Sequence, residues 1–348
     1  MNSVSKAAAR FGTNILSIQP VHVGLIHDTY IVRYSNSPAI ILQCINQHSF
    51  AQPENIILNY RKMTGYLAES PAAINIPAMV PTHDGQYFFR DENMEDETVR
   101  FWRATAYVEN CYSVSTLSSP GLAATAAGAY ARFTCSLEGL DPSGWNQVIA
   151  GFHDLSLRYR QFEQSTYEAR LFRLMKATHI IATLREKYHY VEWFEQVSKD
   201  EENYPTRFLH HDCKLNNILF DTDSDNVVAV VDLDTVMPGK YFSDLGDMIR
   251  TMACTEDEES RNWESIDINP MLYDAIVNGY VSAMEGRLTP AEMAHLKEAG
   301  ILVTYMQALR YTADYLNNDL YYKTNSPDHN LYRAFNQLIL LEKLEALP

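Results

Sequence analysis

Residues 208–250 read FLHHDCKLNNILFDTDSDNVVAVVDLDTVMPGKYFSDLGDMIR and contain most of the chemically distinctive side chains of this 348-residue chain. The segment His210–Asn217 has the form H-x-D-x-K-x-x-N. Two short apolar runs follow, Ile218–Phe220 and Val227–Val231, with a polar turn between them, which is the pattern of a β-hairpin. Asp232 comes directly after the second run. The predicted hairpin therefore returns this carboxylate to the loop that carries the pattern.

These residue types together suit the transfer of a phosphoryl group to a hydroxyl. The carboxylate of Asp212 would take the proton of the acceptor hydroxyl. Asn217 and Asp232 would supply oxygen ligands that hold Mg²⁺ against the phosphates, and Lys214 would offset charge in the transition state. His210 is expected to brace the loop by hydrogen bonding. Loop, hairpin and second aspartate agree in order and spacing, which predicts a site of the protein-kinase-like type.

A metal-hydrolase site is an alternative, and its ligands would be His210, His211, Asp212, Asp232 and Asp234. Adjacent histidines on a strand point to opposite faces, so both would not reach one metal ion. This interpretation also leaves Lys214 and Asn217 unexplained. Asp234 itself either supports Mg²⁺ or makes a structural hydrogen bond, and Asp244 and Asp247 are expected to cap a helix or brace the loop.

The first ~105 residues are predicted to be rich in strands, with one helix. Val21–Val32 is typical of a hairpin, and Ala39–Ile45 of a strand rich in β-branched residues. Pro53–Ala68 has apolar residues at helical spacing. Gln86–Phe89 and Val99–Val108 are two further predicted strands, joined by an acidic turn.

The remainder of the chain is predicted to be mostly helical. The clearest helical segments are Gly121–Leu137, Tyr167–Glu186, Met271–Met284 and Ala291–Leu316. A strand-rich start followed by a helical remainder predicts an α+β fold, with a small β-rich lobe on a larger helical lobe.

Charge and composition exclude several classes of partner. The chain has 28 basic and 44 acidic residues, a net charge of −16, so nucleic acid and membrane surfaces are not expected partners. No apolar run approaches the ~20 residues that a membrane-spanning helix needs, and residues 1–12 lack the apolar stretch of a secretory signal. The five cysteines are scattered, with no CxxC pair. A reduced, cytoplasmic location is therefore the expectation.

The chain resembles the aminoglycoside phosphotransferase and choline kinase superfamily, and most closely its N-acetylhexosamine 1-kinase branch. That branch has a loop like HNDTKxxN, then IDLDTxMPG, then DxGDxxR. The corresponding segments here are His210–Asn217, Val231–Gly239 and Asp244–Arg250. The similarity extends, in chain order, to Gly24–Val32, Ile41–Asn46, Ala106–Ser113 and Arg310–Glu345.

The resemblance implies a two-lobed kinase-like fold with ATP, or another nucleoside triphosphate, held between the lobes together with Mg²⁺. It implies a nucleotide-binding lobe at 1–106 and a catalytic and substrate-binding lobe at 107–348, with a hinge near 106–110. A phosphate-covering turn would contain Gly24, His27, Asp28 and Thr29. Hinge contacts to the base would come from Tyr107, Val108 and Glu109. For His27 and Asp28 a turn or capping role remains an open alternative.

By the same resemblance, Arg310 and Tyr321 would bind the sugar while Asp212 receives its anomeric hydroxyl, which implies an N-acetylhexosamine 1-kinase. In the alternative, Arg310 pairs with Asp314 one helical turn on, and Tyr321 is an apolar packing residue. A kinase of an aminoglycoside, a choline-like amino alcohol or another sugar is the second hypothesis. The sequence does not separate GlcNAc from GalNAc, nor a monomer from a dimer.

One feature departs from the kinase pattern. Protein kinases place a lysine on the third strand to hold the α- and β-phosphates, but that strand here has Gln43 and Cys44 at the corresponding place. Arg33, Arg61 and Lys62 are the cations that could compensate. The missing lysine also prompts a third hypothesis, a non-catalytic nucleotide-binding module.

Overall fold

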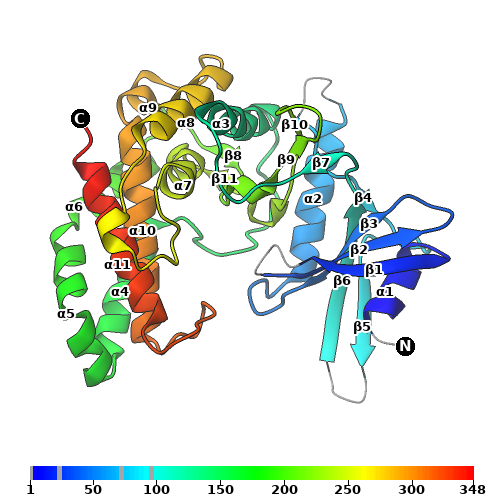
Figure 1. Cartoon of the computed structure of the whole chain (residues 1–348), viewed down its shortest axis with the longest axis horizontal. Coiled ribbons are helices and arrows are strands. Elements are labelled where there is room, and N and C mark those ends of the chain that lie inside the picture. Colours follow the sequence, from blue (N-terminus) through cyan, green and yellow to red (C-terminus); the bar gives the residue numbers. More distant parts are fainter. Residues whose placement is uncertain (1–2, 22–25, 70–73, 94–97) are drawn as a thin grey trace.

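The computed structural model describes residues 3–21, 26–69, 74–93 and 98–348 (Figure 1). Its N-terminal part is a six-stranded sheet in which all paired strands are antiparallel. The strands are β1 (Ile15–Val21), β2 (Asp28–Tyr34), β3 (Ile40–Ile45), β4 (Met79–Val80), β5 (Phe89–Asn93) and β6 (Thr98–Ala106). They are ordered β1-β2-β3-β6-β4, and β5 pairs with the first half of β6.

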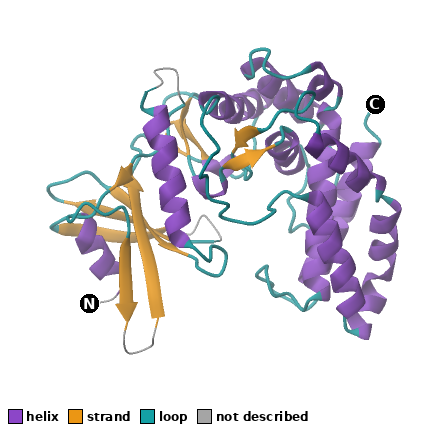
Figure 2. Cartoon of the chain, turned by 180° about the vertical axis from the view of Figure 1, so that it is seen from behind, coloured by secondary structure: helices purple, strands orange, loops and turns teal. Residues whose placement is uncertain are grey.

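Two helices cover opposite faces of this sheet. Phe101 and Trp102 are neighbours on β6 and therefore point to opposite faces. Trp102 packs in the apolar cluster of α1 (Ser3–Phe11), and Phe101 packs in a cluster with α2 (Pro53–Leu67). Tyr60 of α2 belongs instead to the core of the helical part. Helix α2 therefore connects the two parts of the molecule, as Figures 1 and 2 show.

The predictions for the N-terminal part need three corrections. The hairpin predicted at Val21–Val32 begins earlier, because β1 starts at Ile15. The strand predicted at Gln86–Phe89 starts only at its last residue and continues into the acidic segment, where Ser3 of α1 donates a hydrogen bond to Asp91. Helix α1 was not predicted, because its buried face consists largely of alanines, which give a weak periodic signal.

The rest of the chain is mostly helical (Figure 2). Its helices are α3 (Pro120–Ser136), α4 (Leu155–Glu168), α5 (Leu171–Glu186), α6 (His189–Lys199), α7 (Phe242–Met252), α8 (Pro270–Ala283), α9 (Pro290–Ala294), α10 (Leu296–Leu316) and α11 (His329–Glu345). Its short strands are β7 (Cys111–Tyr112), β8 (Arg207–Leu209), β9 (Ile218–Asp221), β10 (Val227–Val230) and β11 (Met237–Gly239). Three 3₁₀ turns lie at Leu215–Asn217, Leu233–Thr235 and Trp263–Ser265.

The predicted two-lobed α+β fold is confirmed, and so is the hairpin, in which β9 pairs antiparallel with β10. The predicted helix Tyr167–Glu186 is two helices, because Ala169 and Arg170 have extended backbones. The predicted helix Ala291–Leu316 is interrupted at His295. Among the helices of the described ranges, none is long and apolar enough to cross a bilayer.

Close packing of α7 against α10 positions the polar residues of α7. A Cβ atom at Gly246 would overlap the backbone of Ala299, so only glycine allows this approach. Asp244 and Asp247 lie on the same short helix and are buried. The helix therefore presents two carboxylates inside the protein, where they need hydrogen-bond donors.

Candidate active site

The donors for α7 come from the backbone of the loop between β8 and β9. Asp244 accepts hydrogen bonds from the N–H groups of His210 (3.0 Å) and His211 (2.8 Å). Asp247 accepts one from the N–H of Cys213 at 2.8 Å and pairs with Arg250 at 2.9 Å. Both aspartates therefore brace the loop, one of the two roles predicted for them.

The two histidines of the loop have separate structural partners. His210 Nε2 lies 2.9 Å from the carbonyl oxygen of Val231, as its predicted bracing role requires. His211 has a left-handed backbone (φ 65°), and its ring lies between the Ser243 hydroxyl and the carbonyl oxygen of Met237. Across the described ranges no three His, Cys, Asp or Glu side chains form a metal-binding group. The geometry therefore gives the metal-hydrolase alternative no support.

The loop brings Asp212, Lys214 and Asn217 together. Lys214 Nζ lies 3.3 Å from Asp212 Oδ1, and the Asn217 amide nitrogen donates to the Asp212 carbonyl oxygen at 3.0 Å and to Oδ2 at 3.3 Å. The Asp212 carboxylate raises the pKa of Lys214, which keeps the ammonium charged. Asp212 is thus oriented from two sides, while part of its side chain is exposed.

Asp232 follows β10 and enters the same cavity. Its backbone is left-handed (φ 61°, ψ 59°), which turns the chain sharply into the Leu233–Thr235 turn. Asp232 keeps exposed surface and lines the cavity, although protein surrounds the residue closely. This partial desolvation, followed by the charges of Asp234 and Asp212, raises the pKa of Asp232. A cation near these carboxylates would relieve their repulsion.

Asp234 lies two residues further on and is fully paired. It accepts hydrogen bonds from Arg103 of β6, one of them at 2.8 Å, and lies 2.8 Å from His27 Nε2. His27 Nδ1 accepts the N–H of Asn46, so Nε2 is the protonated nitrogen that faces Asp234. Burial raises the pKa of Asp234, but the charge of Arg103 and the His27 hydrogen bond outweigh it and lower that pKa.

A cavity of about 530 Å³ lies between the sheet and the loop. The residues proposed for the phosphate end line it, namely Asp212, Lys214, Asn217 and Asp232. Apolar side chains of β2, β3 and β9 line it as well, namely Ile31, Ile41 and Leu219. A cavity with one apolar part and one charged part has room and chemistry for a base and its phosphates.

The residues predicted to contact the nucleotide have different positions. His27, Thr29, Tyr107 and Val108 line the cavity. Glu109 and the exposed Asp28 are not part of its lining; Glu109 lies 3.8 Å from Arg33. The prediction for Gly24 falls outside the described residues.

None of the three cations predicted to compensate for the missing strand lysine lines the cavity. Arg33 packs over the Tyr107 ring. Arg61 packs over Tyr87, and Lys62 donates to a backbone carbonyl. The cation that the sheet does present is Arg103, which sequence reasoning missed although an arginine inside the apolar run FWRATA is a signal of a buried pair.

Arg310 and Tyr321 lie in a second cavity, of about 430 Å³, which Asp212 does not line. The Arg310 guanidinium packs among aromatic rings, 5.8 Å from the centre of Tyr321. Asp314 accepts hydrogen bonds from the N–H groups of Tyr321 (2.8 Å) and Tyr322 (3.0 Å) instead of pairing with Arg310. The predicted alternative in which Arg310 pairs with Asp314 is therefore wrong. Tyr321 is 52% exposed, so the alternative that places it in an apolar core is wrong as well.

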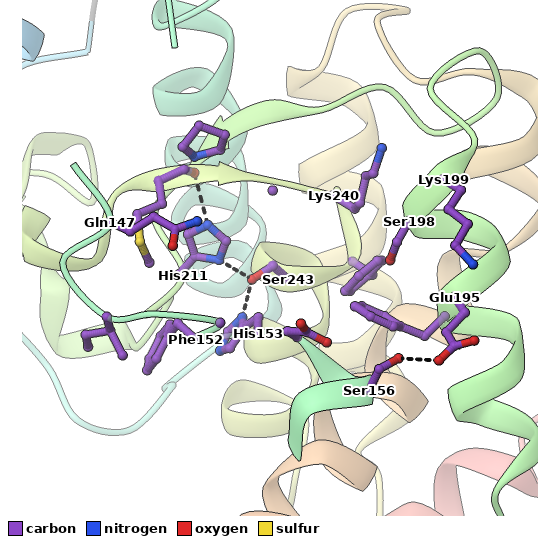
Figure 3. Close-up of a pocket in the computed structure, with 18 of the residues that line it drawn as sticks. Gln147, Phe152, His153, Ser156, Glu195, Ser198, Lys199, His211, Lys240 and Ser243 are labelled. Carbon is purple, nitrogen blue, oxygen red and sulfur yellow. Dashed lines mark hydrogen bonds between the residues drawn. The ribbon is translucent and has the colours of Figure 1, made fainter. Parts of the chain in front are cut away.

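A third cavity, of about 680 Å³, is lined by His153, His211 and Ser243 among others (Figure 3). In it the Ser243 hydroxyl contacts both His153 and His211. Burial lowers the pKa of both histidines, which favours the neutral rings. The Nδ1 atom of each ring is hydrogen-bonded to the Ser243 hydroxyl. This network holds His211 in the cavity that Asp212 does not line.

Comparison with known proteins assigns a family to this arrangement. The model of a family described as the phosphotransferase enzyme family matches residues 17–287. A microcompartment-associated aminopropanol kinase is similar with 18% identity and a TM-score of 0.67, over 98% of this chain and 95% of that one. An amicoumacin kinase in complex with AMP-PNP, Ca²⁺ and Ami has 12% identity and a TM-score of 0.65, over 98% of this chain and 92% of that one. An ethanolamine kinase of Plasmodium vivax has 12% identity and a TM-score of 0.62, over 94% and 84%.

Proposed function

The chain belongs to the phosphotransferase enzyme family, and we propose that it transfers a phosphoryl group from ATP, or another nucleoside triphosphate, to the anomeric hydroxyl of an N-acetylhexosamine. Residues 1–106 would hold the nucleotide, and residues 107–348 would supply the catalytic loop and the acceptor site. The product would be the sugar 1-phosphate.

The observation that carries the proposal is the arrangement of Asp212, Lys214 and Asn217 on one braced loop beside Asp232. Lys214 and the Asn217 amide hold the Asp212 carboxylate at 3.3 Å each. Asp212 can therefore take the proton of a hydroxyl as that hydroxyl attacks the γ-phosphate. The ammonium of Lys214 would stabilise negative charge on the transferred group.

The donor set at this end of the cavity fits a divalent cation. Asn217 uses its amide nitrogen on Asp212, which leaves its amide oxygen available. No donor of the described ranges bonds to the Asp232 carboxylate. Oxygen ligands of this kind suit Mg²⁺, which would neutralise part of the phosphate charge when bound. We therefore assign the metal to Asn217 and Asp232.

The base would occupy the apolar part of the cavity, where it meets the backbone of Tyr107 and Val108. Thr29, which accepts a hydrogen bond from Gln43 at 3.3 Å, would face the phosphates. The structure gives no equivalent reason to include Asp28 or Glu109.

The acceptor assignment relies on charge. Arg310 lies beside Arg158, whose pKa burial and Arg310 lower to about 10. Hydroxyl and acyl oxygens of a neutral sugar could accept hydrogen bonds from these guanidinium groups, with Tyr321 packed on the sugar ring. This placement requires the anomeric hydroxyl to extend from that cavity to Asp212, which lines the other one. A kinase of an aminoglycoside, an amino alcohol or another sugar is the second candidate, favoured by the carboxylate of Asp314 in the same cavity.

The test is a coupled assay of ADP release with ATP and Mg²⁺. The acceptors are GlcNAc, GalNAc, glucose, galactose, choline, 1-amino-2-propanol and an aminoglycoside, and Asp212→Asn is the blank. Phosphorus NMR of the product then identifies the phosphorylated oxygen. Turnover of an N-acetylhexosamine at C1, absent in the blank, supports the proposal. Turnover of another acceptor alone would overturn the acceptor assignment, and nucleotide binding without turnover of any acceptor would favour the binding module.

A further inference from the structure

The phosphate end of the main cavity needs a cation from the sheet side, and β3 does not provide one. Its cavity-facing polar residue is Gln43. Within the described lining, Arg103 is the only arginine and Lys214 the only lysine. Lys214 belongs to the catalytic loop, where it lies 3.3 Å from Asp212 and is assigned above to the transferred group. Arg103 is therefore the cation that the sheet itself contributes to this lining.

Arg103 stands next to the position that the strand lysine would occupy. In the sheet register Arg103 of β6 is directly opposite Gln43 of β3, and its Nε donates to Gln43 Oε1 at 3.0 Å. Its side chain is 3% exposed, and the remaining surface faces the cavity. The register thus places a guanidinium where kinases place an ammonium, delivered from the neighbouring strand.

The hydrogen bonds of Arg103 leave donors for a ligand. A guanidinium has five N–H donors, and three are used, one on Gln43 and two on Asp234. Two donors therefore remain without loss of the existing bonds. Asp234 follows Asp232 by two residues, so its ion pair also holds Arg103 close to the proposed metal ligand.

We propose that Arg103 binds phosphate oxygens of the nucleotide in place of the missing strand lysine. Its bonds to Gln43 and Asp234 preorganise the guanidinium, so that little side-chain entropy is lost when the nucleotide binds. The inference rests on the proposed function, because it requires a nucleotide in this cavity.

A purely structural ion pair between the sheet and the Asp234 turn is the competing explanation. The phosphate-binding and structural explanations differ in how the affinity for a nucleoside or nucleotide depends on its phosphates. A phosphate-binding arginine stabilises ADP and ATP but not adenosine, whereas a structural pair affects all three alike through the shape of the cavity. The ratio of adenosine to ADP dissociation constants is therefore the deciding quantity.

The experiment measures calorimetric binding of adenosine, ADP and ATP, with Mg²⁺, to the wild-type chain and to Arg103→Met. Because that variant leaves the buried Asp234 carboxylate without its guanidinium partner and with only the His27 hydrogen bond, the double variant Arg103→Met with Asp234→Asn is measured as well. Arg61→Met, which removes a cation outside the cavity, is the matched control. Circular dichroism melting confirms that each variant is folded.

We expect both Arg103 variants to weaken ADP binding by about 10- to 100-fold, the range for hydrogen bonds to a charged group. Adenosine binding should change by less than about twofold, and Arg61→Met should bind both ligands like the wild type. An unchanged adenosine-to-ADP ratio in the folded double variant would overturn the role of Arg103. Failure of the wild-type chain to bind ATP or ADP would instead overturn the proposed function, so the two failures are distinguishable.

Discussion

Replacing Asp244 by asparagine tests whether α7 holds the catalytic loop. The side chain of Asp244 is fully buried, and its two oxygens accept the N–H groups of His210 and His211 at 3.0 and 2.8 Å. In Asp244→Asn one oxygen becomes an NH₂ group of almost the same size. One backbone N–H then loses its acceptor and faces another donor, with no change in packing volume.

The magnitude follows from these two contacts. A hydrogen bond to a charged group contributes about 1.5–3 kcal/mol, and a buried donor without a partner costs about 1–3 kcal/mol. We therefore expect the free energy of unfolding to fall by about 3–5 kcal/mol. With about 2.1 cal/mol/K of unfolding entropy per residue over 348 residues, Tm should fall by about 4–7 °C.

The assay is thermal denaturation followed by circular dichroism, with ADP release measured on the same samples at 25 °C. Asp274→Asn is the matched control, because Asp274 is exposed on α8, and its Tm should stay within about 1 °C of the wild type. Turnover by Asp244→Asn should also fall, since the same bonds position Asp212 two residues beyond His210. A variant with the Tm and turnover of the wild type would refute the bracing role of Asp244.

Three further predictions concern other parts of the molecule. Asp212→Asn should lower kcat by about 10²- to 10⁴-fold with the Kd for ATP unchanged; wild-type turnover would show that another group is the base. Glu258 is desolvated, yet the charge of Arg250 lowers its pKa from 4.5 to about 2. The charged form is thus the stabilising one, and its contribution is present above pH 4.5 and lost as the pH falls towards 2. The difference in Tm between wild type and Glu258→Gln should therefore shrink between pH 7 and pH 3. A constant difference would contradict the pairing of Glu258 with Arg250. Gly279→Ala should lower the free energy of unfolding in urea by about 1–3 kcal/mol, because its Cβ would lie 2.5 Å from a carbonyl oxygen of α3. The control is Gly65→Ala, where a Cβ meets nothing within 4 Å, and it should raise that free energy by about 0.5–1 kcal/mol. Equal effects of the two substitutions would argue against close packing of α3 on α8.

The local parts of the site follow from the sequence. The segment His210–Asn217, the hairpin after it and Asp232 lie within 23 residues of one another. Over such a distance the lengths of two strands and one turn leave little freedom, so order and spacing predict which side chains meet. Apolar periodicity likewise predicts the segments that form α3, α5, α8 and α10, but not the breaks at Ala169–Arg170 and at His295.

The pairing of distant charges is decided only by the tertiary structure. Arg103 meets Asp234 across 131 residues, and His27 meets the same carboxylate across 207. Many arginines and aspartates could pair in a chain with 28 basic and 44 acidic residues, and no local pattern selects one combination. Strand register and the packing of the sheet against the loop select it. The tertiary structure likewise decides that Arg310 and Asp212 line different cavities. The sequence by itself therefore determined which polar side chains the loop His210–Asn217 and the following hairpin bring together. Which cation the sheet presents to the cavity depended instead on contacts that exist only once the sheet packs against that loop.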